Sequence, residues 1–238
     1  MLHAALRVSL SCALWLTVVS CGGSEKKAEA PPARAVAEEK APEASAADAR
    51  PVIAAFGDSI SAGFGVEPGK SYPDDLQRLI DAAGFRFRVV NLGVSGDTTA
   101  DGVERLQSVL SVRPVVVILE FGGNDGLRGQ PATESAKNLR TMVEQLRNSG
   151  ADVLLAGMTL PRNYGPEYIG AFDRMYVDLA REFHLDRIPF LLEGVGGNPA
   201  LMQPDGIHPN AKGAEIVAAT AMKYLEPELV RRSKQSRR

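Results

Sequence analysis

Short, continuously apolar runs recur along the chain and predict buried β-strands. None of them alternates cleanly between apolar and polar residues, which indicates strands that are covered on both faces, as in parallel sheets. The runs are PVIAAF (51–56), RVVNL (88–92), VVVILEF (115–121), DVLLAGM (152–158) and IPFLL (188–192).

Helical periodicity fills the intervals between these runs. Apolar residues three or four positions apart predict a helix that ends at Gly84, another that ends at Gly150, a third over residues 169–183, and a last one from about Asn210 to about Leu229. Strands that alternate with helices form βα units joined by right-handed crossovers. The expected fold is therefore a three-layer α/β/α sandwich around a five-stranded parallel sheet. The marker residues of the first three helices are Leu76, Leu79, Ile80 and Ala83; Leu139, Met142, Val143 and Leu146; and Ile169, Phe172, Met175, Tyr176, Leu179 and Phe183.

The N-terminus departs from this pattern and predicts export. Residues 1–20 contain one arginine and then an apolar stretch that is too short to span a bilayer, as in a signal peptide. The text VVSC resembles a bacterial lipobox, which implies that Cys21 is lipidated and becomes the new N-terminus; Cys12 lies too early. We therefore expect a lipid-anchored protein of the bacterial cell envelope. An ordinary secretory signal that happens to contain cysteine is the alternative.

The segments around the periodic region have a biased composition. Residues 21–50 are rich in Ala, Glu, Lys and Pro and lack large apolar residues, so they are expected to form a tether. Residues 51–230 form the expected catalytic domain, and residues 231–238 form a basic tail. The tail is expected to be solvated, with a contact to anionic lipid or cell-wall polymer as the alternative. Cys21 is the last cysteine, which excludes disulfides and thiol chemistry in the mature chain.

Composition and charge narrow the function classes. The chain has 238 residues, 45% of them hydrophobic, and a formal net charge of -2, which suits one domain of moderate size plus extra segments. This charge implies no polyanionic partner, so no nucleic acid is expected. We expect a monomer that needs no cofactor or metal and contacts the membrane through its lipid anchor.

Polar residues gather where the predicted strands end. GDSIS follows the first strand, GVSGDTT the second and GGNDG the third, so all three loops open at the carboxyl edge of the sheet, where ligands bind in such folds. A fourth stretch, DGIHPN, precedes the last helix and holds Asp205 and His208 three positions apart. In a tight loop this spacing lets a carboxylate lie beside an imidazole.

These loops supply every group that acyl transfer requires. Ser59 is the nucleophile candidate, His208 its base, and Asp205 the group that orients the base. The backbone N–H groups of Ser59 and Gly96 and the side-chain amide of Asn124 are the candidate oxyanion donors. Singly, these residues have structural alternatives, because serine is a favoured helix cap and an Asp–His pair can be a surface ion pair. Together, in order on one sheet edge, they indicate an active site.

Other polar residues are expected to be structural. His184 lies at a helix end away from the polar loops, where capping is expected. Asp58 and Asp97 are expected to bond loop N–H groups, and Asp125 to shape its turn.

The loops LPRNYGPEYIG and GVGGNPALMQPDG are expected to flank the site. They contribute Tyr164, Leu201 and Met202 as candidate substrate-binding residues, together with Tyr168 and Val195. These side chains would line an acyl groove, and loop packing is their alternative role.

The chain resembles the SGNH, or GDSL-type, hydrolases over about residues 52–228. The four sequence blocks of that family are matched by GDSIS, VSGDTT, GGND and DGIHPN. Within that family, the periplasmic acyl-CoA thioesterase and lysophospholipase group and its arylesterase relatives have sequences similar to EFGGNDGLRG and LPRNYG. The resemblance implies a flavodoxin-like SGNH hydrolase fold and hydrolysis of aryl esters, acyl thioesters or lysophospholipids. It also implies a Ser59–His208–Asp205 triad with Ser59, Gly96 and Asn124 as oxyanion donors. Ile60 replaces the leucine of the family's first block, a change of similar volume.

A carbohydrate O-acetyl esterase is the main alternative, because the same family includes such activities. A non-catalytic binding lipoprotein of the same fold also stays open, although all four blocks keep their reactive atoms. An α/β-hydrolase would need a G-x-S-x-G elbow, which the chain lacks. A phosphate-binding loop would need glycine where Phe64 stands, and a metal hydrolase would need a histidine pair at ligand spacing, which is absent.

Overall fold

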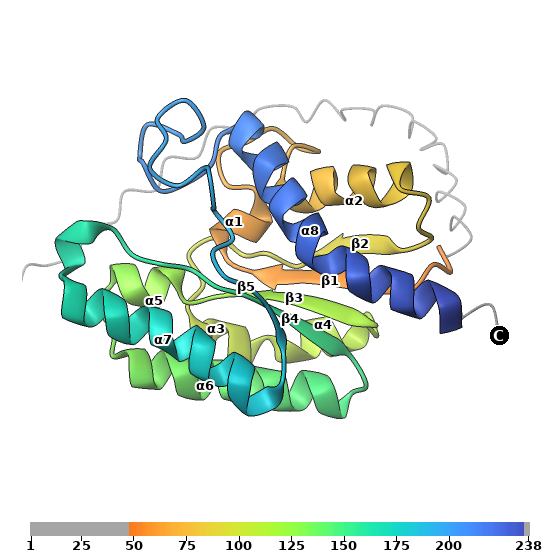
Figure 1. Ribbon diagram of the computed structural model, residues 1–238, viewed down its shortest axis with the longest axis horizontal. Helices are drawn as coiled ribbons and strands as arrows, with labels where there is room; N and C mark the ends of the chain where they lie inside the picture. Colours follow the sequence, from red (N-terminus) through yellow and green to blue (C-terminus); the bar gives the residue numbers. More distant parts are fainter. Residues whose placement is uncertain (1–47, 236–238) are drawn as a thin grey trace, which may run out of the picture. The chain divides into compact units, whose positions relative to one another are not determined.

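Residues 48–235 are described by the computed structural model (Figure 1). Their sheet has five parallel strands in the order β2-β1-β3-β4-β5, the flavodoxin-like order. This confirms the predicted parallel sheet. The strands are β1 (Val52–Gly57), β2 (Arg88–Asn91), β3 (Val116–Glu120), β4 (Asp152–Ala156) and β5 (Asp186–Ile188).

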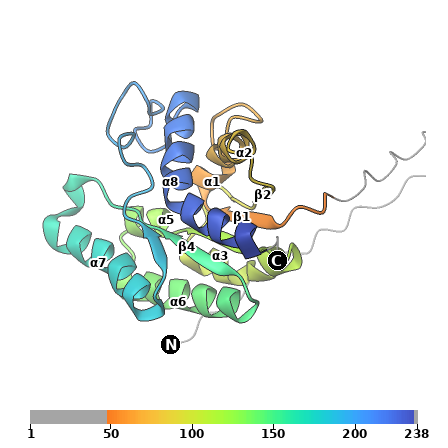
Figure 2. The ribbon, with the colours of Figure 1, turned by 45° about the vertical axis from the view of Figure 1, so that its right-hand side comes forward.

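Helices cover both faces of the sheet, which confirms the three-layer sandwich. Figures 1 and 2 show α2 and α8 on one face and the helices from α3 to α7 on the other. The first face carries α1 (Ser59–Ala62) at its edge, α2 (Tyr72–Ala82) and α8 (Ala211–Gln235). The second carries α3 (Thr99–Glu104), α4 (Leu106–Ser111), α5 (Gly123–Leu127), α6 (Ala132–Asn148) and α7 (Pro166–Phe183), with the short 3-10 helix η1 (Arg162–Tyr164) before α7.

The central strands carry the core. Every residue of β1 and β3 is buried, as the continuous apolar runs predicted. Gly84 and Gly150 follow α2 and α6 with φ values of 76° and 91°, a left-handed conformation that glycine adopts without strain. The helix ends predicted at these glycines are therefore confirmed.

The last strand differs from its prediction. The run at 188–192 was expected to be a strand, but β5 ends at Ile188 because Pro189 has no N–H to continue the ladder. The chain then folds back, and Leu191 donates its N–H to the Gly157 carbonyl at 2.9 Å. Leu191 and Leu192 are still buried, so the apolar run fills the core from a loop.

The final helix is longer than predicted. It was expected to end near Leu229 with a solvated basic tail after it, but α8 continues to Gln235. Arg231 and Arg232 both pair with Asp152 at the start of β4, and both pair with Glu228 one turn earlier. These carboxylates explain why the first part of the tail is helical, while Arg231, Lys234 and Gln235 are exposed to solvent, as expected.

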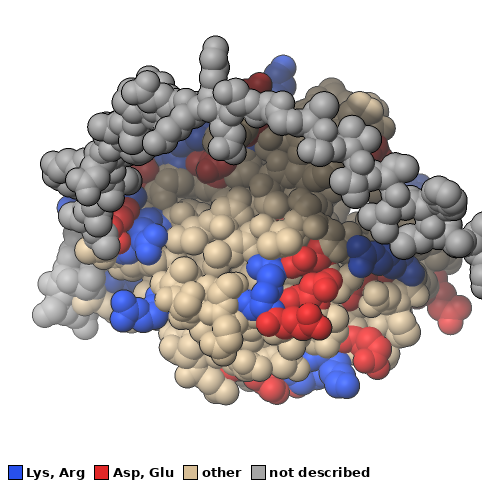
Figure 3. Space-filling model, turned by 180° about the vertical axis from the view of Figure 1, so that it is seen from behind, with Lys and Arg blue, Asp and Glu red and all other residues tan. Residues whose placement is uncertain are grey.

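The surface and the N-terminal segment complete the description. On the face shown in Figure 3, basic and acidic side chains lie interspersed. None of the helices within residues 48–235 combines the length and the apolar character needed to cross a membrane. The predicted signal peptide, Cys21 and nearly all of the tether lie outside the described residues.

Candidate active site

Ser59 is the first residue of α1, directly after β1. The N-cap of this short helix is Asp58, whose Oδ1 accepts the Ile60 N–H at 3.0 Å. Ser59 therefore begins the helix, as expected, but the alternative that its hydroxyl caps the helix is wrong. Because Asp58 caps α1, the Ser59 hydroxyl is available for another partner.

That partner is His208, which the fold brings to Ser59 from the loop before α8. The His208 Nε2 lies 2.9 Å from the Ser59 Oγ, and its Nδ1 lies 2.7 Å from the Asp205 Oδ2. The other oxygen of Asp205 accepts the N–H groups of Ile207 at 2.9 Å and His208 at 3.0 Å. Burial raises the pKa of Asp205, but these hydrogen bonds outweigh it and lower the pKa to about 2. Asp205 is therefore ionised beside the imidazole.

Two contacts fix the loop that carries His208. The Gln203 side chain donates to the Phe64 carbonyl at 2.7 Å and to the Pro209 carbonyl at 2.9 Å, so it joins this loop to the segment after α1. The Phe64 ring lies on the imidazole with a centroid distance of 4.6 Å. His184, as predicted, is the C-cap of α7 and plays no part here.

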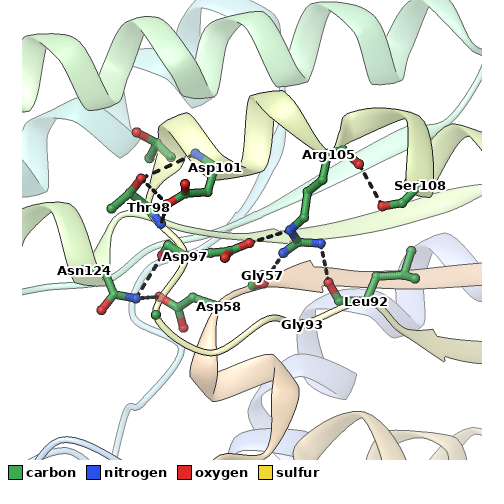
Figure 4. Close-up of polar contacts among 12 residues, drawn as sticks. Gly57, Asp58, Leu92, Gly93, Asp97, Thr98, Asp101, Arg105, Ser108 and Asn124 are labelled. Carbon is green, nitrogen blue, oxygen red and sulfur yellow. Dashed lines mark hydrogen bonds and ion pairs between the residues drawn. The ribbon is translucent and has the colours of Figure 1, made fainter. Parts of the chain in front are cut away.

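The candidate oxyanion donors lie on three loops at the carboxyl edge. Asn124 is in the first turn of α5, and its Nδ2 donates to the Asp97 carbonyl at 2.9 Å and to the Asp58 Oδ2 at 3.2 Å (Figure 4). Gly96 has a φ of 89°, which explains why glycine is needed there. Among the hydrogen bonds of residues 48–235, the backbone N–H groups of Ser59 and Gly96 have no acceptor. Both groups are thus free to bind an oxyanion.

Two aspartates of these loops have structural roles. The Asp125 carboxylate accepts the Thr99 N–H at 2.9 Å and the Thr99 and Ser135 hydroxyls at 2.5 and 3.0 Å, so it is structural but joins α5 to α3 and α6 rather than shaping only its own turn. Asp97 was expected to bond loop N–H groups, but its carboxylate instead pairs with the Arg105 guanidinium. The fold of the chain explains this pairing, because α3 carries Arg105, eight residues further along the chain, back beside Asp97.

Glu120 is a buried carboxyl that the sequence analysis did not select. Its Oε2 accepts the Asp58 N–H at 3.1 Å and the Ser61 hydroxyl at 2.9 Å, while its Oε1 is buried and has no hydrogen-bond partner among residues 48–235. Burial, and next the charge of Asp58, raise the pKa of Glu120 well above its usual value; burial also raises the pKa of Asp58. The one signal in the sequence was a glutamate at the end of an otherwise apolar strand.

The raised pKa of Glu120 predicts a stability that falls as pH rises. The unfolded chain releases the Glu120 proton from about pH 4, whereas the folded protein keeps it up to the raised pKa, so between these two pKa values the free energy of unfolding falls by up to about 1.4 kcal/mol per pH unit. Glu120→Gln should reduce this slope, as measured by urea unfolding at increasing pH from about pH 4 upward. Glu226→Gln, on the exposed face of α8, is the matched control and should keep it. An unchanged slope in Glu120→Gln would show that Glu120 is ionised in the folded protein.

A cavity of about 420 Å³ opens beside the Ser59–His208 pair. Asp58, Gly123 and Asn124 also line it, so it reaches the oxyanion loops. Its remaining wall is mostly apolar and includes Leu127, Met158, Leu160, Phe190, Leu192, Met202 and Ile207.

The cavity corrects the expected acyl groove. Met202 lines it, but Tyr164 and Leu201 do not. The Tyr164 hydroxyl donates to the Leu127 carbonyl at 2.8 Å, which ties the ring to the end of α5, and Leu201 packs against the core. Of the two other candidates, Tyr168 donates to the Gln130 carbonyl at 2.5 Å and Val195 is buried in the core. Four of the apolar lining residues that were missed follow β4 and β5 in loops, while Leu127 ends α5 and Ile207 lies in the loop before α8.

The site and the fold agree with the comparisons with known proteins. The model of the GDSL-like Lipase/Acylhydrolase family matches residues 55–216. The chain belongs to this family. Esterase TesA of Pseudomonas aeruginosa is 47% identical over 154 residues, which cover 64% of this chain and 77% of the relative. Thioesterase 1/protease 1/lysophospholipase L1 of Escherichia coli K12 is 38% identical over 173 residues, or 72% of this chain and 82% of the relative.

A solved structure extends the similarity to three dimensions. The crystal structure of TesA superposes with a TM-score of 0.72 at 42% identity and covers 74% of this chain and 98% of that one. This member of the GDSL-like family is therefore a serine hydrolase that acts on ester bonds.

Proposed function

We propose that Ser59, His208 and Asp205 form the catalytic triad of this hydrolase. The observation that carries the proposal is the continuous contact from the Asp205 carboxylate through the imidazole to the Ser59 hydroxyl at the mouth of an apolar cavity. His208 takes the Ser59 proton at Nε2 while Oγ attacks the acyl carbonyl carbon. Asp205, ionised and bonded to Nδ1, holds the tautomer that leaves Nε2 free to accept.

The reaction then proceeds in two halves. The carbonyl oxygen becomes an oxyanion that binds the N–H groups of Ser59 and Gly96 and the Asn124 amide. Collapse of the tetrahedral intermediate breaks the bond to the alcohol or thiol, which leaves with the proton from His208. Water, deprotonated by His208, next attacks the acyl-enzyme and releases the acid and free Ser59.

The shape and lining of the cavity support an acyl chain as the specificity element. Its wall beyond the oxyanion loops is apolar, which suits aryl esters, acyl thioesters and lysophospholipids. The names of the relatives, an esterase and a thioesterase/lysophospholipase, point the same way. Neither observation favours a carbohydrate O-acetyl esterase, whose acyl group would leave most of this cavity empty.

The chain-length dependence of kcat/KM tests the acyl cavity. Over p-nitrophenyl esters of increasing chain length, kcat/KM should rise and then level off, because each buried methylene contributes up to about 0.8 kcal/mol. Met202→Ala should reduce the preference for octanoate over acetate, since Met202 lines the cavity. Leu201→Ala is the matched control, one residue away and outside the lining, and should keep the wild-type preference. A maximum at acetate together with fast turnover of an acetylated oligosaccharide would establish the carbohydrate-esterase alternative instead.

We also propose that the protein is lipidated at Cys21 and acts at the cell envelope as a monomer. The signal-like residues 1–20 and the VVSC text support the anchor. The proposed triad is complete within one chain, so catalysis would require no group from a second subunit.

Cys21→Ser is expected to abolish incorporation of an alkyne fatty acid in growing cells and to release the hydrolase from the membrane fraction. Cys12→Ser is the control and should be labelled like the wild type. Label retained in Cys21→Ser would show that the anchor is attached elsewhere.

A further inference from the structure

Arg105 lies between α3 and α4, where its guanidinium reaches back under the polar loops (Figure 4). Its Nη2 donates to the Gly57 carbonyl and its Nη1 to the Leu92 carbonyl, both at 2.7 Å, and its Nε pairs with the Asp97 carboxylate. The side chain is 21% exposed. One guanidinium thus binds three acceptors from two segments, the end of β1 and the loop between β2 and α3.

Each acceptor belongs to a loop that carries a candidate oxyanion donor. Gly57 ends β1 two residues before Ser59. Leu92 begins the loop that leads to Gly96, and Asp97 follows Gly96 directly. Asp97 reaches the third donor as well, because its carbonyl accepts the Asn124 amide at 2.9 Å. All three donors are therefore within a few bonds of the same guanidinium.

Two aromatic rings fix the plane of this guanidinium. Its central carbon lies 4.5 Å from the centroid of Phe56 and 5.4 Å from that of Phe121, and the two rings pack edge to face. Phe56 is in β1 and Phe121 directly follows β3. The planar guanidinium, with its five N–H donors, can bind the three acceptors and stack on the aromatic rings at the same time. The ammonium group of lysine is a compact point charge and stacks poorly.

We propose that Arg105 is a positioning residue that sets the spacing of the three oxyanion donors. This proposal rests on the assignment of Ser59, Gly96 and Asn124 given above. Arg105 itself does not contact the substrate, since it lies beneath the loops and does not line the cavity. It holds Gly57, Leu92 and Asp97 at fixed distances from one another. A small displacement of any of them would move an oxyanion donor and change the fit to an oxyanion.

Arg105→Lys tests the proposal. The kcat for p-nitrophenyl butyrate should fall by roughly 10²-fold while KM changes by less than about threefold, because the oxyanion exists only after attack. The Ki of an octyl trifluoromethyl ketone, which adds to Ser59 to form an oxyanion, should rise by the same factor as kcat/KM falls. A purely structural role would lower stability without this matched change in Ki.

Arg232→Lys is the matched control. Arg232 is also 21% exposed and also binds carboxylates, but those are Glu228 and Asp152, outside the polar loops. This variant should keep both kcat and Ki within about twofold of the wild type at temperatures where it is folded. If Arg105→Lys does not fold, Asp97→Asn is the second test, because it keeps the arginine and weakens only its ion pair with residue 97. It should then show a smaller fall in kcat, again with a matched rise in Ki.

Unchanged kcat in a folded Arg105→Lys, or a loss of kcat with unchanged Ki, would overturn the proposal. Ser59→Ala, measured in parallel, separates this result from a failure of the triad assignment. If Ser59→Ala still hydrolyses the ester, the nucleophile is wrong. If it is inactive while Arg105→Lys behaves like the wild type, only the role of Arg105 is wrong.

Discussion

Ser59→Ala is expected to lower kcat for p-nitrophenyl butyrate by a factor on the order of 10⁵ to 10⁶ while the domain stays folded. The hydroxyl supplies the attacking atom, and without it neither His208 nor the oxyanion donors can form the acyl-enzyme. Stability should change little, since Asp58 rather than Ser59 caps α1. Steady-state kinetics, circular dichroism and the thermal midpoint measure the two effects separately.

The matched control for this variant is Ser111→Ala, at the exposed end of α4. It should hydrolyse the ester at the wild-type rate. Labelling by a fluorophosphonate probe gives an independent reading, because the wild type and Ser111→Ala should react and Ser59→Ala should not. Hydrolysis or labelling that persists in a pure, folded Ser59→Ala sample would disprove the assigned nucleophile.

Asn124→Ala is expected to lower kcat by about 10²- to 10³-fold with a smaller change in KM. The Nδ2 group is held by the Asp97 carbonyl at 2.9 Å, and its contact to the Asp58 Oδ2 is longer, at 3.2 Å. The hydrogen that points toward Asp58 makes the weaker contact, so it can be shared with an oxyanion when charge develops beside it. Loss of this donor weakens binding of the intermediate much more than binding of the neutral ester.

Asn163→Ala is the control for the asparagine, because it removes an exposed amide from the loop near the cavity. Its kcat and KM should both match those of the wild type. The variants are compared with acetate and octanoate esters, since a lost oxyanion donor lowers kcat equally for both. If Asn124→Ala changes only KM, Asn124 binds the substrate rather than the oxyanion.

Most of the fold could be predicted because burial leaves a strong pattern. The strands β1, β3 and β4 lie where continuous apolar runs predicted them, and Gly84 and Gly150 mark two helix ends. The catalytic candidates could also be chosen from the sequence, since the carboxyl ends of parallel strands meet at one edge. The structure brings Ser59, His208 and Asp205 into contact there.

The remaining features depend on contacts between distant segments. Pro189 lies in an apolar run, and only the sheet shows that the ladder stops before it. The Tyr164 hydroxyl has many possible acceptors, and its bond to the Leu127 carbonyl, which directs the ring away from the cavity, is set by the packing of two loops. The sequence gives no sign of the contacts of Arg105, because its three acceptors become neighbours only when the strands assemble. Local sequence patterns therefore cannot predict these long-range partners.

The distance along the chain between Ser59 and His208 has a consequence for biosynthesis. They are 149 positions apart, and the loop with His208 is held by contacts around the start of α8, the last helix. With the proposed triad, a nascent chain that ends before this loop contains the nucleophile and the oxyanion donors but no base. Ester hydrolysis is then expected to begin only when synthesis is almost complete and α8 has docked on the sheet. Truncated or stalled chains are expected to be inert toward esters of the cell that makes them.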